Sequence, residues 1–276
     1  MDWDPDFLAR SPMLEPLRAA GGTLCTPGWP ARDALQRSLD RDGDPVSTAS
    51  GLPLRLAPAG GRKRSFEERY EARVHLKGEM VFRDRDWHDL LNLLVWLTFP
   101  RAKAALNARH FAALAAQRAA GMSNRGPAQD ALTLVDEGGV IVATCDDELC
   151  RLLREWRWKE LFWGNRERLK AGMRFILFGH ALYEKALQPF IGITGRGVLL
   201  EVEPGLLARP VGEQIAVLDA RLAAHVYDSR NMTATHELAV VPILGVPGWH
   251  PDNEREEFYD DTGYFRPGRI REQRDK

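Results

Sequence analysis

The pattern of apolar and polar positions is least regular at the N-terminal end of the chain. Residues 1–64 hold many of the prolines and glycines and show a short helical periodicity only around residues 32–39. The segment ends in the run Gly60-Gly61-Arg62-Lys63-Arg64. We expect residues 1–64 to form a loosely ordered arm packed on the domain, and residues 65–276 to form a single α+β domain.

The strongest helical pattern lies at residues 87–98. Asp86 stands where a helix cap is favoured, and Asp89 follows three residues later as in a capping box. Pro100 ends this helix and, because proline is tolerated in a first turn, starts a second helix through residues 104–120. Further helical patterns follow at residues 147–158, 161–170, 174–188 and 211–225.

Alternating or apolar runs predict short strands between the helices. Residues 72–76 alternate as a half-buried strand does, and residues 80–82 predict a second strand after a turn at residues 77–79. Residues 131–135 and 140–143 flank Asp136-Glu137-Gly138-Gly139, which is typical of a hairpin. Residues 198–202 predict another strand.

These elements predict an α+β fold: a single, mainly helical globular domain with short antiparallel strands or hairpins. After residue 240 we expect an irregular, aromatic-rich C-terminal tail. Its aromatic residues favour a segment strapped over the domain surface, with a lid over a cleft as the alternative.

Composition narrows the class of protein. The chain has 276 residues, is 44% hydrophobic and 28% charged, and carries a formal net charge of −1, which excludes a disordered chain and any strong global attraction to nucleic acid. Its three cysteines suggest no disulfide framework. The acidic start is unlike a signal peptide, and the apolar stretch at residues 90–100 is too short for a membrane span. We expect a cytoplasmic protein with no membrane partner.

A histidine in the first turn of the predicted helix 87–98 is the first candidate for chemistry. His88 and Asn92 project from one face, near a helix N-terminus whose N–H groups favour anions. We expect a metal ligand at His88, a catalytic carboxylate at Asp89 and an anion contact at Asn92. The structural alternative is that Asp89 caps the helix while His88 and Asn92 bond to nearby backbone.

A second candidate is the pair His180 and Glu184, which lie four apart on a predicted helix. This spacing lets both side chains reach one ion, or lets the glutamate orient the imidazole. The alternative is a buried pair that satisfies its own hydrogen bonds.

A third candidate is Asp136, at the end of a predicted strand beside Glu137. A carboxylate there would complete a metal site begun by the two histidines. The alternative is turn chemistry before Gly138 and Gly139.

Basic residues alternate with aromatic ones between Trp156 and Lys170, a pattern that would suit stacked bases and phosphates. The apolar positions fall at helical spacing, however, which favours an amphipathic helix with a solvated basic face. Nucleic-acid binding is therefore a minor alternative.

Several segments resemble those of the domain of unknown function 3025 family, an uncharacterised bacterial family. They are Trp87-His88-Asp89-Leu90-Leu91-Asn92, Phe99-Pro100-Arg101-Ala102-Lys103, Asp130-Ala131-Leu132-Thr133-Leu134-Val135-Asp136-Glu137, Phe178-Gly179-His180-Ala181-Leu182-Tyr183-Glu184-Lys185, Leu244-Gly245-Val246-Pro247-Gly248-Trp249 and Phe258-Tyr259-Asp260-Asp261. The likeness covers residues 65–268 and implies a single domain, but no activity, cofactor or catalytic residue.

The leading hypothesis is a metal-assisted hydrolase that acts on an ester or phosphoester through a divalent metal ion. In it His88, His180 and Asp136 are metal ligands, Glu184 and Asp89 are the catalytic carboxylates, and Lys103, Arg125 and Asn92 bind the anion. The alternative is a non-catalytic protein that binds a small anionic ligand or a protein partner. The hydrolase requires these side chains to converge in one accessible cleft, whereas the binding protein requires only a groove.

Overall fold

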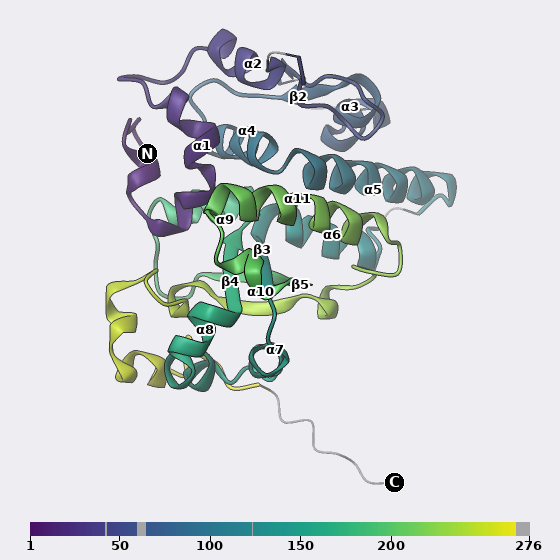
Figure 1. The fold of residues 1–276 in the computed structure, drawn as a ribbon. Helices are drawn as coiled ribbons and strands as arrows, with labels where there is room; N and C mark the ends of the chain where they lie inside the picture. The colour runs from purple at the N-terminus through teal and green to yellow at the C-terminus, as the bar shows by residue number, and fades with distance from the viewer. Residues whose placement is uncertain (42, 60–64, 123, 269–276) are drawn as a thin grey trace.

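A four-stranded sheet forms the centre of the computed structural model, which describes residues 1–41, 43–59, 65–122 and 124–268 (Figure 1). The strand order is β4-β3-β5-β6, with β3 parallel to β5 and the two outer pairings antiparallel. Every residue of β3 is buried, as expected of a central strand. The strands are β3 (Gly139–Thr144), β4 (Met173–Leu177), β5 (Thr194–Glu201) and β6 (Ala239–Pro242).

Helices surround this sheet. In the view of Figure 1, long helices lie above the sheet, and other helices lie below it, near the C-terminal segment. The upper helices are α4 (Trp87–Thr98), α5 (Pro100–Ala119), α6 (Pro127–Gly138) and α11 (Val211–Tyr227); the lower are α7 (Asp147–Arg154) and α8 (Arg166–Gly172). The short helices are α9 (His180–Ala186), α10 (Pro204–Leu207) and a π-helical turn at Glu160–Gly164. The chain is a mixed α+β protein, as the sequence predicts.

The described part of the N-terminal segment contributes to the core. Leu14, Leu17 and Leu39 are fully buried in the same apolar cluster as α4. Residues 60–64, which the sequence places at the end of an arm, lie outside the described residues. The elements here are α1 (Arg18–Gly21), α2 (Arg32–Asp40), α3 (Tyr70–Lys77), and a parallel pair of strands, β1 (Arg55–Ala57) and β2 (Glu79–Val81).

Short 3-10 turns complete the described secondary structure. They span Phe7–Ala9, Pro12–Leu17, Gly22–Leu24, Phe66–Glu68, Thr235–Glu237, Ile243–Gly245, Pro251–Glu254 and Glu256–Asp260. No helix in the described ranges combines the length and apolar character that crossing a membrane requires.

The junction between α4 and α5 follows the sequence prediction. The Asp86 carboxylate accepts a hydrogen bond from the Asp89 N–H at 3.0 Å, which satisfies a backbone donor at the start of α4. Pro100 is the first residue of α5, and the bend falls at Phe99. The chain therefore changes direction at Phe99, between the end of α4 and the start of α5.

Two predicted strands are helices in the structure. Residues 72–76 lie in α3, which ends at Gly78 with a φ of 67°, a left-handed conformation that glycine adopts without strain. The predicted turn at residues 77–79 is therefore a helix end, and β2 pairs with β1 instead of forming a hairpin. Residues 131–135 lie in α6, which begins at Pro127 and ends at Gly138, so the predicted hairpin there is also wrong.

One predicted helix is a strand followed by a helix. Residues 174–188 were expected to be helical throughout, but the chain forms β4 up to Leu177 and then α9 from His180. Residues 175–177 of this apolar run form the end of β4, where three successive side chains are buried and so need not alternate with polar ones. This correction places His180 at the start of a helix rather than in the middle of one.

The C-terminal tail packs against the lower part of the molecule. Tyr259 donates a hydrogen bond to the Gly245 carbonyl at 3.0 Å, and Tyr264 donates one to the Ile193 carbonyl at 2.8 Å. None of residues 247–266 lines the pocket described below. This part of the tail therefore straps the surface and does not cover that pocket.

Candidate metal centre

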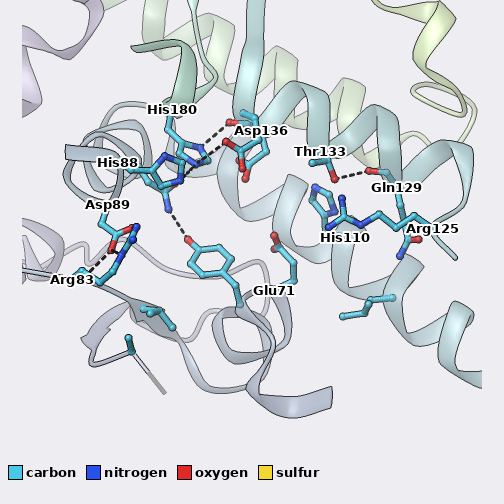
Figure 2. Close-up of a pocket in the computed structure, with 16 residues that line it drawn as sticks. Glu71, Arg83, His88, Asp89, His110, Arg125, Gln129, Thr133, Asp136 and His180 are labelled. Carbon is cyan, nitrogen blue, oxygen red and sulfur yellow. Dashed lines mark hydrogen bonds and ion pairs between the residues drawn. The ribbon is translucent and has the colours of Figure 1, made fainter. Parts of the chain in front are cut away.

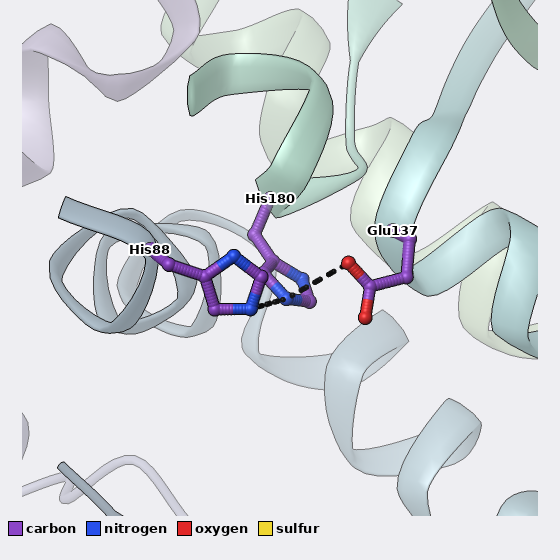
Figure 3. A group of neighbouring side chains, drawn as sticks. All are labelled: His88, Glu137 and His180. Atoms are coloured by element: carbon purple, nitrogen blue, oxygen red, sulfur yellow. Dashed lines mark hydrogen bonds and ion pairs between the residues drawn. The ribbon is translucent and has the colours of Figure 1, made fainter. Parts of the chain in front are cut away.

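Side chains from three helices meet beside the end of the sheet (Figure 3). His88 comes from α4, Glu137 from α6 and His180 from α9, and one nitrogen or oxygen atom of each lies within 4.8 Å of the others. The Nε2 atoms of His88 and His180 are 3.1 Å apart, and Glu137 Oε2 is 3.5 Å from Nε2 of His180. No other group of three histidine, cysteine or acidic side chains meets this criterion among the described residues.

A close backbone approach between the turn that follows β4 and the junction of α6 with β3 positions His180. The N–H groups of Phe178 and Gly179 both donate to the Gly139 carbonyl at 2.9 Å. A Cβ atom on Gly179 would lie 2.4 Å from the backbone nitrogens of Gly138 and Gly139, so only glycine fits this crossing. The next residue is His180, whose Nδ1 lies 2.8 Å from the backbone carbonyl oxygen of Asp136.

The packing of α4 against α9 positions His88. Its Nδ1 lies 3.1 Å from Glu184 Oε2, so a carboxylate on α9 orients an imidazole on α4. Glu184 was expected to pair with His180 on its own helix, but its contact is with His88. The expected proximity of a histidine and Glu184 is therefore present between helices rather than within one.

The hydrogen bonds fix which nitrogen of each imidazole carries its proton. A carbonyl oxygen and a carboxylate only accept hydrogen bonds, so Nδ1 of His180 and Nδ1 of His88 are the donors. In the neutral rings the two Nε2 atoms then present lone pairs to each other at 3.1 Å. Two lone pairs repel at this distance unless a proton or a metal ion lies between them.

The spacing and chemistry of these atoms fit a divalent metal ion. Two imidazole nitrogens bound at ~2.05 Å to a tetrahedral ion lie about 3.3 Å apart, close to the separation here. A carboxylate oxygen is a usual third ligand, and histidine with carboxylate suits borderline ions such as zinc. Three protein ligands would leave one coordination position of a four-coordinate ion unfilled, an arrangement typical of catalytic rather than structural sites.

Electrostatics keeps His180 neutral. The pKa of His180 is lowered to about 4, mainly by burial; Asp136 opposes this shift, and Lys103 and His88 contribute to it. Burial and the adjacent Asp136 raise the pKa of Glu137. A neutral imidazole is the form that binds a metal ion, and the proximity of a cation would favour the ionised form of Glu137.

The Asp136 carboxylate is not one of the three candidate ligands, because it is paired with Lys103. The backbone carbonyl of Asp136 accepts from His180. Burial alone would raise the pKa of Asp136, but Lys103, His180 and His110 lower it to about 2. Glu137, the next residue, offers the carboxylate that Asp136 was expected to offer.

Lys103 and Asn92 are interior residues. The Lys103 side chain is 3% exposed, donates to Asn92 Oδ1 at 2.9 Å and lies 5.5 Å from the ring centre of Trp96. Asn92 in turn donates to the Tyr70 hydroxyl at 2.8 Å. Both residues were expected to bind an anion, but their polar atoms are engaged with each other and with Asp136 and Tyr70.

Asp89 lines the same side of the pocket and is held by Arg83. Its Oδ2 atom accepts from the backbone N–H and Nε of Arg83, both at 2.8 Å. Its expected catalytic role would require it to exchange this partner for substrate. The structural alternative, in which Asp89 caps the helix, is not what the contacts show either: Asp86 caps α4, and the Asp89 carboxylate binds Arg83.

A polar pocket of about 410 Å³ opens from the histidine pair (Figure 2). Its lining includes Glu71 and His110 from α3 and α5, and Arg125 at the approach to α6. Thr133 and Gln129 lie on α6 before Asp136; at ~1.5 Å per residue, positions 129 to 137 cover about 12 Å of pocket wall. The pocket can therefore hold a ligand that extends well beyond the candidate metal centre.

Glu71 and His110 were not identified in the sequence. Burial raises the pKa of Glu71, while His110 lowers it, so the pocket contains a carboxyl group with a perturbed titration opposite the histidine pair. A signal was present: Lys103, Asn107 and His110 occur at i, i+4 and i+7 in an alanine-rich helix, which places polar groups on one buried face. Glu137 was noted only as a neighbour of Asp136.

The basic and aromatic segment after Trp156 is largely neutralised. Arg157 forms an ion pair with Glu160, Arg166 pairs with Glu254, and Arg168 pairs with Asp146. Lys159 pairs with Glu256 and Asp260, and Lys170 with Glu167, while Trp158 is 4% exposed. These pairings give no support to this segment as a nucleic-acid surface.

The fold and the site define a class: a mainly helical α+β protein whose histidines and glutamate converge in a pocket beside the end of a mixed sheet. The chain belongs to the family described as Protein of unknown function (DUF3025), whose model matches residues 59–269. This confirms the resemblance seen in the sequence. No curated protein and no solved structure matches the chain.

Proposed function

We propose that this protein is a metal-dependent hydrolase that acts on an ester or phosphoester. The observation that carries the proposal is the pair of Nε2 atoms held 3.1 Å apart, with lone pairs facing and the Glu137 carboxylate beside them. A divalent ion would bind to His88, His180 and Glu137, and would supply a Lewis acid and an activated water to the open side of the pocket.

The remaining groups have roles that follow from their contacts. Glu184 orients the His88 imidazole through its contact with Nδ1. The Asp136 carbonyl does the same for His180. Glu71 and His110 line the opposite wall, where they would exchange protons with the leaving group or the attacking water.

The pocket also favours a substrate with a negatively charged group. Arg83 and Arg125 both line it, toward different ends, but Arg83 is paired with Asp86 and Asp89, so Arg125 is the arginine that would contact an anion. Arg125 is one of the three residues expected to bind the anion, and it lines the pocket, whereas Lys103 is buried against Asp136. A phosphoester or a carboxylated ester would interact with the metal ion at its reacting end and with an arginine at its other end.

Activity is tested with 4-nitrophenyl phosphate and 4-nitrophenyl acetate, using protein stripped by a chelator and then loaded with Zn²⁺, Mn²⁺ or Co²⁺. We expect turnover of at least one probe that needs the added ion and falls at least 100-fold in Glu137→Gln and His180→Ala. His250→Ala, which changes a histidine outside the pocket, should keep the wild-type rate.

A second outcome distinguishes the alternative of a non-catalytic binding protein. If metal-loaded, folded wild-type protein turns over neither probe, the hydrolase assignment to these ester classes is wrong. Ion binding without turnover would then leave a metal-containing binding pocket.

A further inference from the structure

A second cavity lies between α7, β5 and the segment that leads into β6. It measures about 690 Å³, and it shares no lining residue with the candidate metal pocket. Figure 1 shows α7 near the bottom of the molecule and α3, which contributes to the metal pocket, near the top. The cavity walls include Arg154, Arg196, Trp156 and Glu237.

The two arginines of this cavity lack the carboxylate partners that neighbouring arginines have. Arg154 and Arg196 make no side-chain hydrogen bond or ion pair with any described residue, although Arg157 and Arg151, close to Arg154, are both paired with glutamates. The lining carboxylate is Glu237, whose Oε1 already accepts from the N–H groups of Thr233 and Ala234 at 3.0 and 3.2 Å. The two guanidinium groups therefore leave the cavity with a net positive charge, which favours an anion.

Trp156 occupies a backbone position that normally suits glycine. The Arg157 N–H donates to the Leu152 carbonyl and the Trp156 N–H donates to the Leu153 carbonyl, so α7 ends in a Schellman motif. In this motif Trp156 is the left-handed residue, with a φ of 60°. A bulky side chain is strained there, and glycine would end the helix without that cost.

A strained tryptophan beside two arginines suggests recognition of a ring that carries a phosphate. The indole is half-buried and lines the cavity, so one part of it packs on the protein and another faces the open space. Aromatic side chains stack with nucleobases, and arginine forks bind phosphate oxygens in pairs. A volume of about 690 Å³ falls in the usual range for small-ligand sites.

We propose that this cavity binds a nucleoside monophosphate or a closely similar phosphorylated aromatic compound. Its base stacks on Trp156 and its phosphate lies between Arg154 and Arg196. The proposal is independent of the hydrolase assignment, because it uses no residue of the metal pocket.

The proposal is tested by isothermal titration of full-length protein with AMP, GMP, CMP and UMP, with adenosine and inorganic phosphate as partial ligands. We expect at least one nucleotide to bind, and both partial ligands to bind at least tenfold more weakly. Arg154→Gln, Arg196→Gln and Trp156→Gly should each raise the nucleotide Kd at least tenfold. The glycine variant removes the ring at a position that tolerates glycine, and thermal unfolding verifies that each variant is folded.

Two matched controls make the result specific. Arg157→Gln removes a neighbouring arginine that is paired with Glu160, and His88→Ala alters the other pocket; both should bind nucleotide as the wild type does. Absence of binding to the folded wild type at millimolar nucleotide, or binding unchanged by both arginine substitutions, would overturn the proposal. Binding of a single-stranded oligonucleotide without binding of any mononucleotide would also overturn it.

Discussion

The two histidines of the candidate metal centre differ in exposure, and this difference sets their roles. The His180 side chain is 4% exposed and is held by a backbone carbonyl, whereas the His88 side chain is 35% exposed and is held by Glu184. A backbone partner cannot be altered by mutation, but Glu184 can. The contribution of Glu184, as the orienting partner of His88, to metal affinity can therefore be measured by mutation.

We predict that Glu184→Gln weakens metal binding by about 10- to 100-fold without removing it, since partners of this kind usually have effects of that size. Glutamine keeps the shape of the side chain but removes the negative charge beside His88 Nδ1. Competition with a chromophoric chelator measures the Kd. An unchanged Kd would show that Glu184 is only a surface neighbour.

The buried pair of Lys103 and Asp136 yields a prediction about stability. We expect Lys103→Met to lower the free energy of unfolding by about 3–5 kcal/mol, because it leaves the Asp136 carboxylate buried without its cation. Urea denaturation at pH 7 measures this change.

The double variant Lys103→Met with Asp136→Asn distinguishes two causes of the lost stability: an unpaired buried charge and the loss of side-chain packing. It should recover at least half of the lost stability, because the remaining buried group is then neutral. A double variant no more stable than the single one would contradict the assignment of charge burial as the cause.

At this scale the sequence predicted the residue types of the site better than their contacts. His88, His180 and Glu184 do meet, but Lys103, which was expected to bind an anion, is buried beside Trp96 and paired with Asp136. Asp136 and Glu137 could not be told apart, because the direction of each side chain depends on whether the segment is a strand or a helix. Tertiary placement therefore decided which of two adjacent carboxylates faces the histidines.

Among the elements, the feature that places His180 is the crossing of the segment between β4 and α9 over the junction of α6 with β3. We predict that Gly179→Ala lowers metal affinity at least tenfold and also destabilises the fold, because the added Cβ would lie 2.4 Å from two backbone nitrogens. Metal titration and thermal unfolding measure the two effects.

Gly212→Ala is the matched control for Gly179→Ala. A Cβ at Gly212 meets no atom within 4 Å, and the residue lies in α11. This control should keep the metal affinity and raise the free energy of unfolding by up to ~1 kcal/mol. If both variants had the same metal affinity and the same free energy of unfolding, the close approach at Gly179 would not be what positions His180.

The start of α7 provides a pH-dependent prediction. Asp146 accepts from the N–H groups of Glu148 and Leu149 at 3.0 and 3.2 Å and is paired with Arg168. Burial opposes the shift, but Arg168 and these backbone donors lower the pKa of Asp146 below its usual 3.8. Because the pKa of the folded state is the lower one, the added stability is present above pH 3.8 and is lost as the pH falls through the folded value.

We therefore expect Asp146→Ala to cost about 1–2 kcal/mol at pH 7, the usual range for a helix cap. The difference from the wild type should shrink as the pH falls below 3.8. Urea denaturation at pH 7 and at pH 3 measures both values. A difference that stays constant with pH would mean that the ionised carboxylate is not the stabilising species.

The sequence predicted helices correctly where the periodic pattern of apolar residues was long. Residues 87–98 were identified to the residue, because a capping aspartate and a proline mark the two ends of α4. Residues 72–76 and 131–135 were assigned as strands because short apolar runs fit either period. Their helical state follows from packing against α5 and α9, which the sequence does not display.

For the whole molecule, the fold brings together positions that are distant in the chain. The three candidate ligands come from α4, α6 and α9, and no local spacing motif joins all of them. The mixed α+β class was predictable from the alternation of helical and strand patterns, whereas the parallel pairing of β3 with β5 was not. The site therefore depends on the topology of the sheet and not on a contiguous sequence.

A metal ion bound between His88 and His180 is the central feature of the proposed site. The most direct measurement is the metal content of untagged protein, by elemental mass spectrometry, for the wild type, His88→Ala, His180→Ala and the control His250→Ala. We predict close to one divalent ion per chain in the wild type and the control, and little in the other two. Folded wild-type protein that neither contains nor takes up a divalent ion would show that a shared proton alone joins the two imidazoles, which would contradict the metal centre.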